Sequence, residues 1–344
     1  FLDGCILIPI FLGIRIKNSE NDNSTTTLNC FNSSIETIIH NFLINKSFAS
    51  KKDNTIIFTE KGRYIYDHIL TTGVLASYAP MLSKISDLLF GDFKTVFKRD
   101  ECSHELHIDR TLNVISSGFQ HEKYFENFEE AVINIFNNVD YRSQPKYIAD
   151  MGCGDGTLLK RIYNIITLKT KRGAVLGEHP ITLIGIDYNL KSLEETTKTL
   201  QDINHVTIHG DIGKPEEVIA SLAEKNITDS NEILHVRSFL DHNRPFIEPK
   251  DLRSIEHKMH IKYNNDYVSS DGEVIHAASV VQSLTEHMQR WSQVTNKHGM
   301  LILEVHSLSP ETAHAYMSKC ESINFDTCHA LSSQFLLGAE IFLL

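Results

Sequence analysis

The chain has 344 residues, which predicts about two domains of ordinary size. Hydrophobic residues make up 41% and charged residues 22%, and this composition excludes a disordered, collagen-like or low-complexity chain. The 44 acidic and 33 basic residues give a formal net charge of −11. Nucleic acid, which carries a dense negative charge, is therefore not an expected partner.

The six cysteines are scattered along the chain, and no two of them have the spacing of a zinc knuckle. They are interpreted as reduced thiols of a cytoplasmic protein. Residues 5–16 are apolar but too few to cross a bilayer, so we expect a strand or the start of a buried helix and no membrane association. Because the chain begins at Phe1 and ends on apolar residues, it is interpreted as a domain excised from a longer polypeptide.

Residues 1–100 are expected to form a mostly helical N-terminal domain. Apolar residues recur at helical spacing over 34–48, a strand-like run follows at 55–58, and a second helical run covers 59–70. This order resembles a winged-helix unit, and a small helical cap explains it equally well. A further apolar helix is predicted over 73–97, and residues 101–144 are interpreted as a lid with connecting helices, including a helix over 125–136.

Residues 145–344 are expected to form an α/β core with a Rossmann-like parallel sheet, because short apolar runs alternate there with helical stretches. The helical stretches between the runs lie at 156–168, 190–203, 214–226 and 274–297. A closing hairpin is predicted at the end of the chain. The expected strands are residues 146–150, 181–187, 205–211, 232–239 and 300–307, and the hairpin is 325–344.

The first of these strands leads into a glycine-rich turn. Asp150 ends the strand, and Gly152, Gly154 and Gly156 precede the next helix. Glycines allow a tight turn and a close approach to a ligand, and the free amides of a helix N-terminus favour a polar or anionic group. A strand before the turn and a helix after it strengthen this interpretation.

This turn resembles the first motif of class I S-adenosylmethionine (SAM) methyltransferases, and its spacing differs from the dinucleotide fingerprint. The resemblance implies that Asp187, after the second strand, binds the ribose, and that Asp211 with Ile212 lies beside the adenine. Tyr124 would close over SAM from the lid, although for this residue by itself packing between domains is the better explanation. The alternative for the acidic residues is that they cap the helices that follow.

The fourth strand ends in a second cluster of polar residues. Asp241 and His242 follow that strand, Gln282 lies on the next helix, and His306 follows the fifth strand. Imidazole, carboxylate and amide oxygen together are suitable ligands for iron or manganese. His287, on the same helix as Gln282, is a further candidate. The alternatives are that His287 occupies a solvated helix position, that His306 caps a strand end and that Gln282 faces the sheet.

Residues 147–156, 235–246 and 303–308, together with 332–342, resemble the C-methyltransferase domains that build branched starter units in modular polyketide synthases of the apratoxin type. The resemblance implies methylation of the α-carbon of a malonyl or methylmalonyl group on an acyl carrier protein, with a mononuclear iron or manganese. It implies His242, Gln282 and Asp241 as metal ligands, and His242, Asp241 and His306 as catalytic residues. Neighbouring synthase domains would be partners.

Two other functions remain open. A metal-free O-methyltransferase of small molecules would use His242 or His306 as a general base and would carry a helical domain at its N-terminus. A non-catalytic module with the SAM-binding fold would serve only as a scaffold in a synthase. The glycine turn and its acidic partners favour an enzyme over the scaffold.

Overall fold

The computed structural model describes residues 2–20, 33–52, 55–98, 100, 105–121, 124–258, 267–269, 273–295, 297–317, 319 and 334–343. The chain forms two compact units, Phe1–Lys123 and Tyr124–Leu344, and each is described by itself. In the described part of the chain, no helix combines the length and the apolar character that crossing a bilayer requires.

The first unit is mostly helical and contains a small antiparallel hairpin. Its elements in chain order are α1(Leu2–Glu20), α2(Ser33–Asn45), β1(Ala49–Lys52), β2(Thr55–Phe58), α3(Glu60–His68), η1(Ile69–Thr72), α4(Gly73–Ser77), α5(Ala79–Leu82), α6(Ile85–Phe90), η2(Phe93–Thr95) and α7(Arg110–His121). Strands β1 and β2 pair with each other, and α2, the hairpin and α3 follow the order of a winged helix.

Local chemistry explains why α3 begins directly after the hairpin. Thr59 caps the helix, because its hydroxyl accepts a hydrogen bond from the Gly62 amide at 3.2 Å. A Cβ at Gly62 would lie 1.9 Å from the carbonyl oxygen of Phe48, so only glycine allows this close approach. Buried apolar side chains from α1, α2 and α3, including Phe11, Leu43 and Tyr66, form the core of the unit.

The single helix predicted over 73–97 is wrong, because the structure divides this stretch into α4, α5, α6 and η2. Pro80 lies at the start of α5, where proline is tolerated but ends any helix that precedes it. Gly91 ends α6 in an extended conformation. The apolar run from 5 to 16, predicted as a strand or a helix start, lies within α1.

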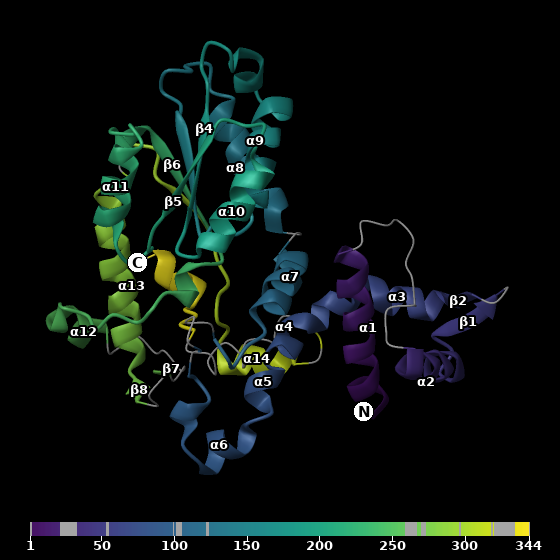
Figure 1. Cartoon of the computed structure of the whole chain (residues 1–344). Coiled ribbons are helices and arrows are strands. Elements are labelled where there is room, and N and C mark those ends of the chain that lie inside the picture. Colours follow the sequence, from purple (N-terminus) through teal and green to yellow (C-terminus); the bar gives the residue numbers. More distant parts are fainter. Residues whose placement is uncertain are drawn as a thin grey trace. The chain divides into compact units, whose positions relative to one another are not determined.

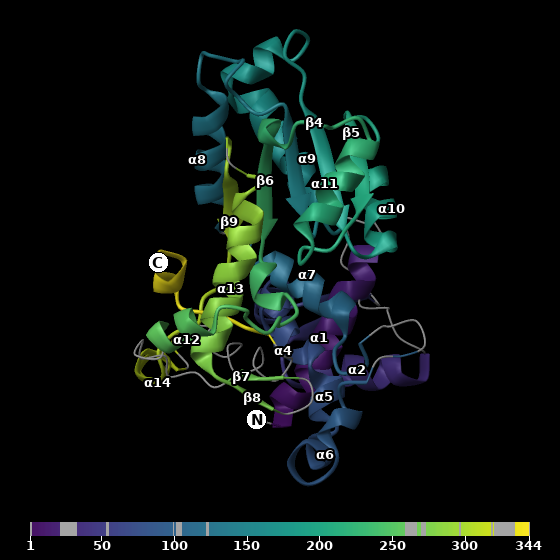
Figure 2. The same cartoon turned by 90° about the vertical axis from the view of Figure 1, so that its left-hand side faces the viewer.

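The second unit is built on a parallel sheet. Its five strands lie in the order β5-β4-β3-β6-β9, and all neighbouring pairs are parallel. Figure 2 shows β9 and β6 on one side of this sheet and β4 and β5 on the other. The five strands predicted from the sequence are present, but the fifth, predicted over 300–307, ends at Leu303. They are β3(Tyr147–Met151), β4(Thr182–Asp187), β5(His205–His209), β6(Ile233–Ser238) and β9(Met300–Leu303).

Helices cover both faces of this sheet (Figure 1). On one face α8(Phe125–Phe136), α9(Thr157–Lys169) and α10(Leu190–Thr199) pack on alternate strand residues such as Ile148 and Leu183. On the other face α11(Pro215–Glu224) and α13(Ala277–Ser292) pack on the residues in between, such as Ala149 and Ile184. Both faces are therefore buried, as expected for a parallel sheet.

The remaining elements of the second unit are short. They are η4(Lys171–Val175), η5(Ser230–Glu232), η6(Asp241–Asn243), α12(Leu252–Lys258), β7(Tyr267–Val268), β8(Val274–Ile275), α14(Pro310–Tyr316) and η7(Ala339–Leu343). Residues 325–333 of the predicted closing hairpin lie outside the described residues. In the described part, 334–343, the prediction is corrected: Ala339–Leu343 forms the 3-10 helix η7 and no strand is assigned to 334–338. The Phe335 amide donates to the His242 carbonyl, and the Leu337 carbonyl accepts from the Ser307 amide.

Candidate active site

The glycine turn between β3 and α9 takes a conformation that requires glycine. Gly152, Gly154 and Gly156 have φ angles of 71°, 55° and 79°, which other residues rarely adopt. A Cβ at Gly156 would also lie 3.1 Å from Cα of Thr196. Around Gly154 there is open space, because no heavy atom lies within 4 Å of its ideal Cβ position. The turn therefore presents bare backbone toward that space.

Asp150 lies beneath this turn and is fully buried at the end of β3. Burial, reinforced by the nearby Asp187, raises the pKa of Asp150 to about 8. Its Oδ1 atom has no hydrogen-bond partner among the described residues. A buried carboxyl group with an unused acceptor fits a cationic ligand, because such a ligand would stabilise the ionised form.

Asp187 connects the turn to the end of β4. Its carboxylate accepts hydrogen bonds from the Gly154 amide at 3.1 Å and from the Asn189 amide at 2.8 Å. Burial raises the pKa of Asp187, and these amide bonds oppose that rise. Asp187, the residue predicted to bind the ribose, thus also holds the glycine turn in place.

The two residues predicted beside the adenine occupy different environments. Asp211 is exposed, and its Oδ1 accepts a hydrogen bond from the Gly213 amide at 2.8 Å. This contact stabilises the turn that leads into α11. The alternative that Asp211 caps this helix is wrong, because the N-cap position of α11 is Lys214. The Ile212 carbonyl accepts a hydrogen bond from the Trp291 indole at 2.9 Å, which ties this loop to α13.

Tyr124 lies immediately before α8, and the residue is 40% exposed. Phe125 packs beneath the guanidinium of Arg161, near the start of α9, and Asn137 accepts a hydrogen bond from the Lys171 amide beyond the end of α9. The two helices therefore run in the same direction. This places Tyr124 toward the end of α9 where the glycine turn lies, and its contact with SAM stays a prediction.

A histidine and a glutamate form a tight pair at the carboxyl ends of β6 and β9. Nδ1 of His242 lies 2.6 Å from Oε1 of Glu304, and the His242 amide donates to Oε2 at 3.0 Å. The side chain of Glu304 is only 3% exposed and that of His242 only 9%. The carboxylate therefore fixes both the position and the tautomer of the imidazole.

This pair borders the glycine turn. Leu240 lies two residues before His242, and its side chain would be 3.1 Å from a Cβ at Gly152. Strands β3 and β6 are also direct neighbours in the sheet. His242, the candidate general base, and the glycine turn therefore lie at the same edge of the sheet.

The sequence singled out His306 in place of Glu304, although both follow β9. His306 is exposed, and its ring contacts Phe342 edge-on at 5.4 Å. Glu304 was missed as a partner because its carboxylate meets His242 only when β6 and β9 pair. The sequence does contain a signal for this pair. Glu304 is an acidic residue directly after the fifth strand, and Asp241 and His242 follow the fourth.

A buried cluster of charged side chains is centred on Asp241, the residue directly before His242. Asp241 is fully buried, and its Oδ1 accepts from Arg237 Nη1 at 2.6 Å and lies 3.1 Å from His287 Nε2. Arg237 stacks on Trp291, with 4.6 Å between the guanidinium and the ring centroid. Burial acts to raise the pKa of Asp241, but the hydrogen bond to His287 and the charge of Arg237 outweigh it and hold that pKa below its usual range.

A second buried arginine, Arg244, donates to the Asp241 carbonyl at 2.7 Å. Burial lowers the pKa of Arg244 to about 10. Burial also lowers the pKa of His287, which favours the neutral form of its imidazole. The contacts of Asp241 indicate that it holds the loop before His242 in position. Its predicted roles in catalysis and metal binding stay predictions.

Gln282 lies on α13 and is engaged by charged neighbours. Its Oε1 accepts from the Lys258 ammonium at 2.6 Å, and its amide donates to Glu286 at 3.2 Å. The oxygen that would bind a metal thus already faces a cation, and Asp241 Oδ1 likewise faces Arg237. Asp241 Oδ2, in contrast, is buried without a hydrogen-bond partner among the described residues. The part of the chain that the structure describes contains no cluster of three His, Cys, Asp or Glu side chains suited to a metal ion, so the three predicted ligands stay a prediction.

Two family models match the sequence. Residues 105–344 match the AprA MT2-like domain, a methyltransferase family, and residues 3–92 match the AprA winged helix domain. No curated protein matches the chain.

Solved structures with a similar order of elements include an O-methyltransferase family protein from Burkholderia thailandensis and the DszA carbon methyltransferase. The first is 10% identical, with a TM-score of 0.44, and the match covers 98% of this chain and 87% of the other. The second is 10% identical, with a TM-score of 0.38, and the match covers 99% and 81%.

The family match, the parallel sheet and the glycine turn agree with one another. The predicted class I methyltransferase core and the N-terminal winged-helix unit are confirmed. The chain is an enzyme that belongs to the AprA MT2-like family of SAM-dependent methyltransferases.

Proposed function

We propose that this enzyme methylates the α-carbon of a malonyl or methylmalonyl group carried by an acyl carrier protein of a polyketide synthase. The observation that carries the proposal is the His242–Glu304 pair, which lies beside the glycine turn. A malonyl α-carbon must lose a proton before it can attack a methyl group. A fixed imidazole next to the methyl donor is suited to that task.

His242 acts as the base in this proposal. Its Nδ1 proton is held by Glu304, so the neutral ring carries its lone pair on Nε2, and Nε2 takes the proton from the α-carbon. The positive charge that forms on the ring is stabilised by the Glu304 carboxylate. SAM, when bound, supplies an electrophilic methyl group. The glycine turn, Asp150 and Asp187 orient that donor.

An assay with intact enzyme tests this proposal. The protein is incubated with SAM and a malonyl- or methylmalonyl-loaded carrier protein, and mass spectrometry follows the carrier. We expect the acyl group to gain one methyl group, and we expect no product without enzyme. Phenolic small molecules, tested in parallel, represent the O-methyltransferase alternative, which the same pair serves by deprotonating a hydroxyl group. Methylation of phenols alone overturns the proposal.

Metal assistance stays a prediction that the contacts of Gln282 and Asp241 do not support. Elemental mass spectrometry of the purified enzyme, followed by exhaustive treatment with a chelator, tests it. We expect turnover to persist after chelation, because His242 supplies the base. Loss of turnover that iron or manganese restores would show that a metal is required.

A further inference from the structure

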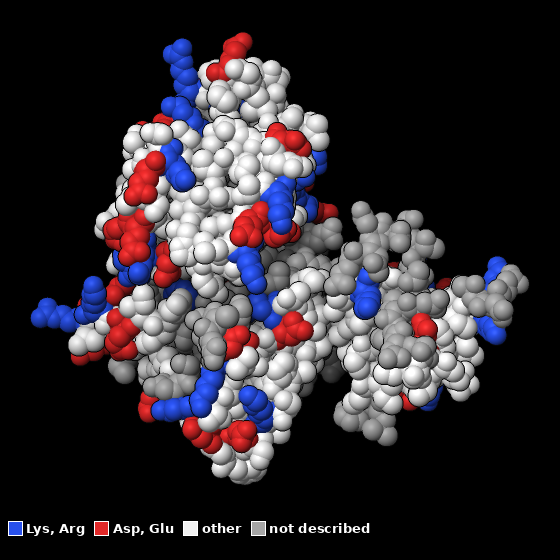
Figure 3. Space-filling view, in the orientation of Figure 1, with Lys and Arg blue, Asp and Glu red and all other residues white. Residues whose placement is uncertain are grey.

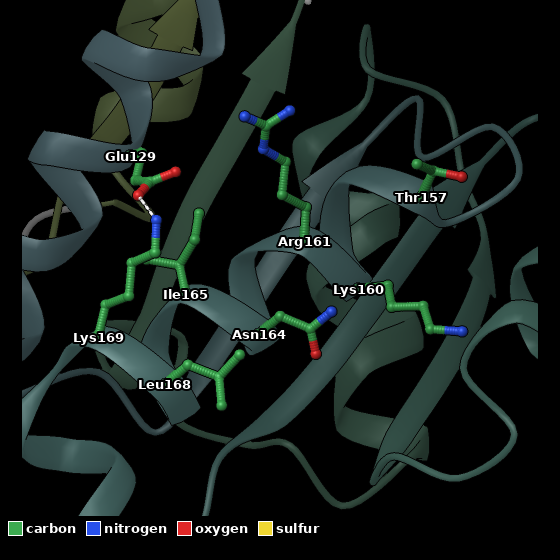
Figure 4. Close-up of a pocket in the computed structure, with 8 residues that line it drawn as sticks. All are labelled: Glu129, Thr157, Lys160, Arg161, Asn164, Ile165, Leu168 and Lys169. Atoms are coloured by element: carbon green, nitrogen blue, oxygen red, sulfur yellow. Dashed lines mark hydrogen bonds and ion pairs between the residues drawn. The ribbon is translucent and has the colours of Figure 1, made fainter.

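The outer surface of the catalytic unit carries a groove between α8 and α9. Its volume is about 380 Å³, and Figure 4 shows Thr157 near one end and the ion pair of Lys169 with Glu129 at the other. Thr157 is the first residue of α9, directly after the glycine turn. The groove therefore starts at the edge of the sheet where the active site lies.

The groove combines an apolar surface with positive charge. Leu168 is 79% exposed, more than any other large apolar side chain described in this unit, and the buried Ile165 lies one turn before it on α9. Lys160 and Arg161 line the same groove, and among the described residues neither has a carboxylate partner. Glu129, the one acidic residue in the lining, is neutralised by Lys169.

Lys160 and Arg161 give the groove a local positive charge in an acidic protein. The formal net charge is −11, and on the face of the catalytic unit seen in Figure 3 basic and acidic side chains are interspersed. A negatively charged partner is repelled by the protein as a whole and is attracted where cations gather beside an apolar contact. Leu168 adds an exposed apolar surface to the groove, and a partner that covers it must present an apolar group as well as negative charge.

We propose that the groove between α8 and α9 docks the acyl carrier protein, through an acidic helix that presents an apolar side chain to Leu168. Two acidic side chains of that helix face Lys160 and Arg161. The carrier then holds its acyl arm next to the glycine turn. The inference rests on the proposed function, because only a tethered substrate needs a docking surface.

Kinetics with two substrates test the docking. One substrate is the loaded carrier protein, and the other is the same acyl group on free pantetheine, which needs no docking. The full chain is compared with the double variant Lys160→Glu/Leu168→Ser and with the control Lys225→Glu. Lys225 is exposed at the end of α11, on the opposite face of the sheet.

We expect the double variant to raise KM for the carrier substrate roughly tenfold, with kcat and pantetheine turnover unchanged. The control should behave like the wild type. Equal KM values for the double variant and the wild type overturn the docking site. A parallel rise in KM for both substrates also overturns it, because the change then acts on the active site.

Binding of a fluorescent carrier protein, followed by anisotropy, separates this inference from the proposed function. We expect the wild type to bind more weakly as salt increases and the double variant to bind weakly at every salt concentration. Equal binding by both overturns the docking site whether or not turnover occurs. If neither substrate is methylated by the wild type, the proposed function fails, and anisotropy alone then decides the docking.

Discussion

The two halves of the active-site edge are built in different ways. Around β3 and β4 the chain positions its own backbone: three glycines with positive φ angles are held by Asp187 through the Gly154 amide. Around β6 and β9 it positions side chains, with Glu304 on His242 and Arg237 on Asp241. The donor half thus depends mainly on the backbone conformation of its glycines, whereas the His242–Glu304 pair of the acceptor half joins residues 62 positions apart in the sequence.

The largest effect is expected at the His242–Glu304 pair. Glu304→Gln removes the charge that stabilises the protonated imidazole, so kcat should fall by about 10²- to 10³-fold. SAM binding, measured by calorimetry, should stay unchanged because the glycine turn is intact. Stopped-time assays with the carrier substrate measure kcat.

His306→Ala is the matched comparison, since this histidine follows the same strand. We expect a change of no more than about twofold, because the ring is exposed and contacts only Phe342 among the described aromatic rings. A larger loss for His306→Ala than for Glu304→Gln would identify His306 as the base. The described pair would then have a structural role.

Arg237→Met should produce the next largest effect, on stability. The change leaves the carboxylate of Asp241 buried without its nearest positive charge, and breaking such a pair costs about 3–5 kcal/mol. Urea unfolding measures the loss. Arg142→Met is the control, because Arg142 is exposed and its substitution should change the free energy of unfolding little. A loss below about 1 kcal/mol would show that the cluster is not a stabilising element.

Gly156→Ala tests the donor half. The alanine must adopt a φ angle of 79° and place its Cβ 3.1 Å from Cα of Thr196, at a cost of about 1–2 kcal/mol. We expect about tenfold weaker SAM binding by calorimetry, with kcat at saturating SAM nearly retained. Gly177→Ala is the control, since no heavy atom lies within 4 Å of its ideal Cβ position. Equal affinities of the two variants would contradict the role of the turn.

Asp150→Asn should have the smallest effect and the most informative pH dependence. Burial raises the pKa of Asp150 from 3.8 to about 8, so between these values the folded state holds a proton that the unfolded state has lost. The contribution of this group to stability therefore decreases as pH rises through that window. At pH 8 we expect the unliganded variant to match or exceed the wild type in Tm.

The same substitution should change how SAM affinity depends on pH. In the wild type, affinity for the cationic ligand should increase as Asp150 ionises near pH 8, and in Asp150→Asn this increase should vanish. Calorimetry from about pH 6.5 to about pH 9 covers the range in which Asp150 is expected to ionise. Parallel pH profiles in both proteins would show that Asp150 does not face the ligand.

The donor half could be largely predicted because its information is contiguous. Asp150 and the three glycines lie within seven residues, and a strand before them and a helix after them are visible as apolar periodicity. The winged-helix order was also visible, but the division of residues 73–97 was not. There, Pro80 and Gly91 interrupt a run whose apolar pattern alone resembles one helix.

The acceptor half could be predicted only in part. His242 stood out as a polar residue after a strand, yet its partner Glu304 lies 62 residues further along the chain. Gln282 was predicted to lie beside His242 because both are near the same sheet edge. In the fold it turns to Lys258 and Glu286, since the direction of a helical side chain depends on what packs beside it.

The sequence by itself determined the class of the enzyme, because backbone conformation and hydrophobic periodicity are local properties and leave a local signature. Glycine spacing and alternating apolar runs are enough to specify a parallel sheet with a donor turn at its edge. Only the tertiary structure decided which side chains meet. Strand pairing brings Glu304 to His242 and the packing of α13 brings His287 to Asp241, and contacts between distant residues have no counterpart in local pattern.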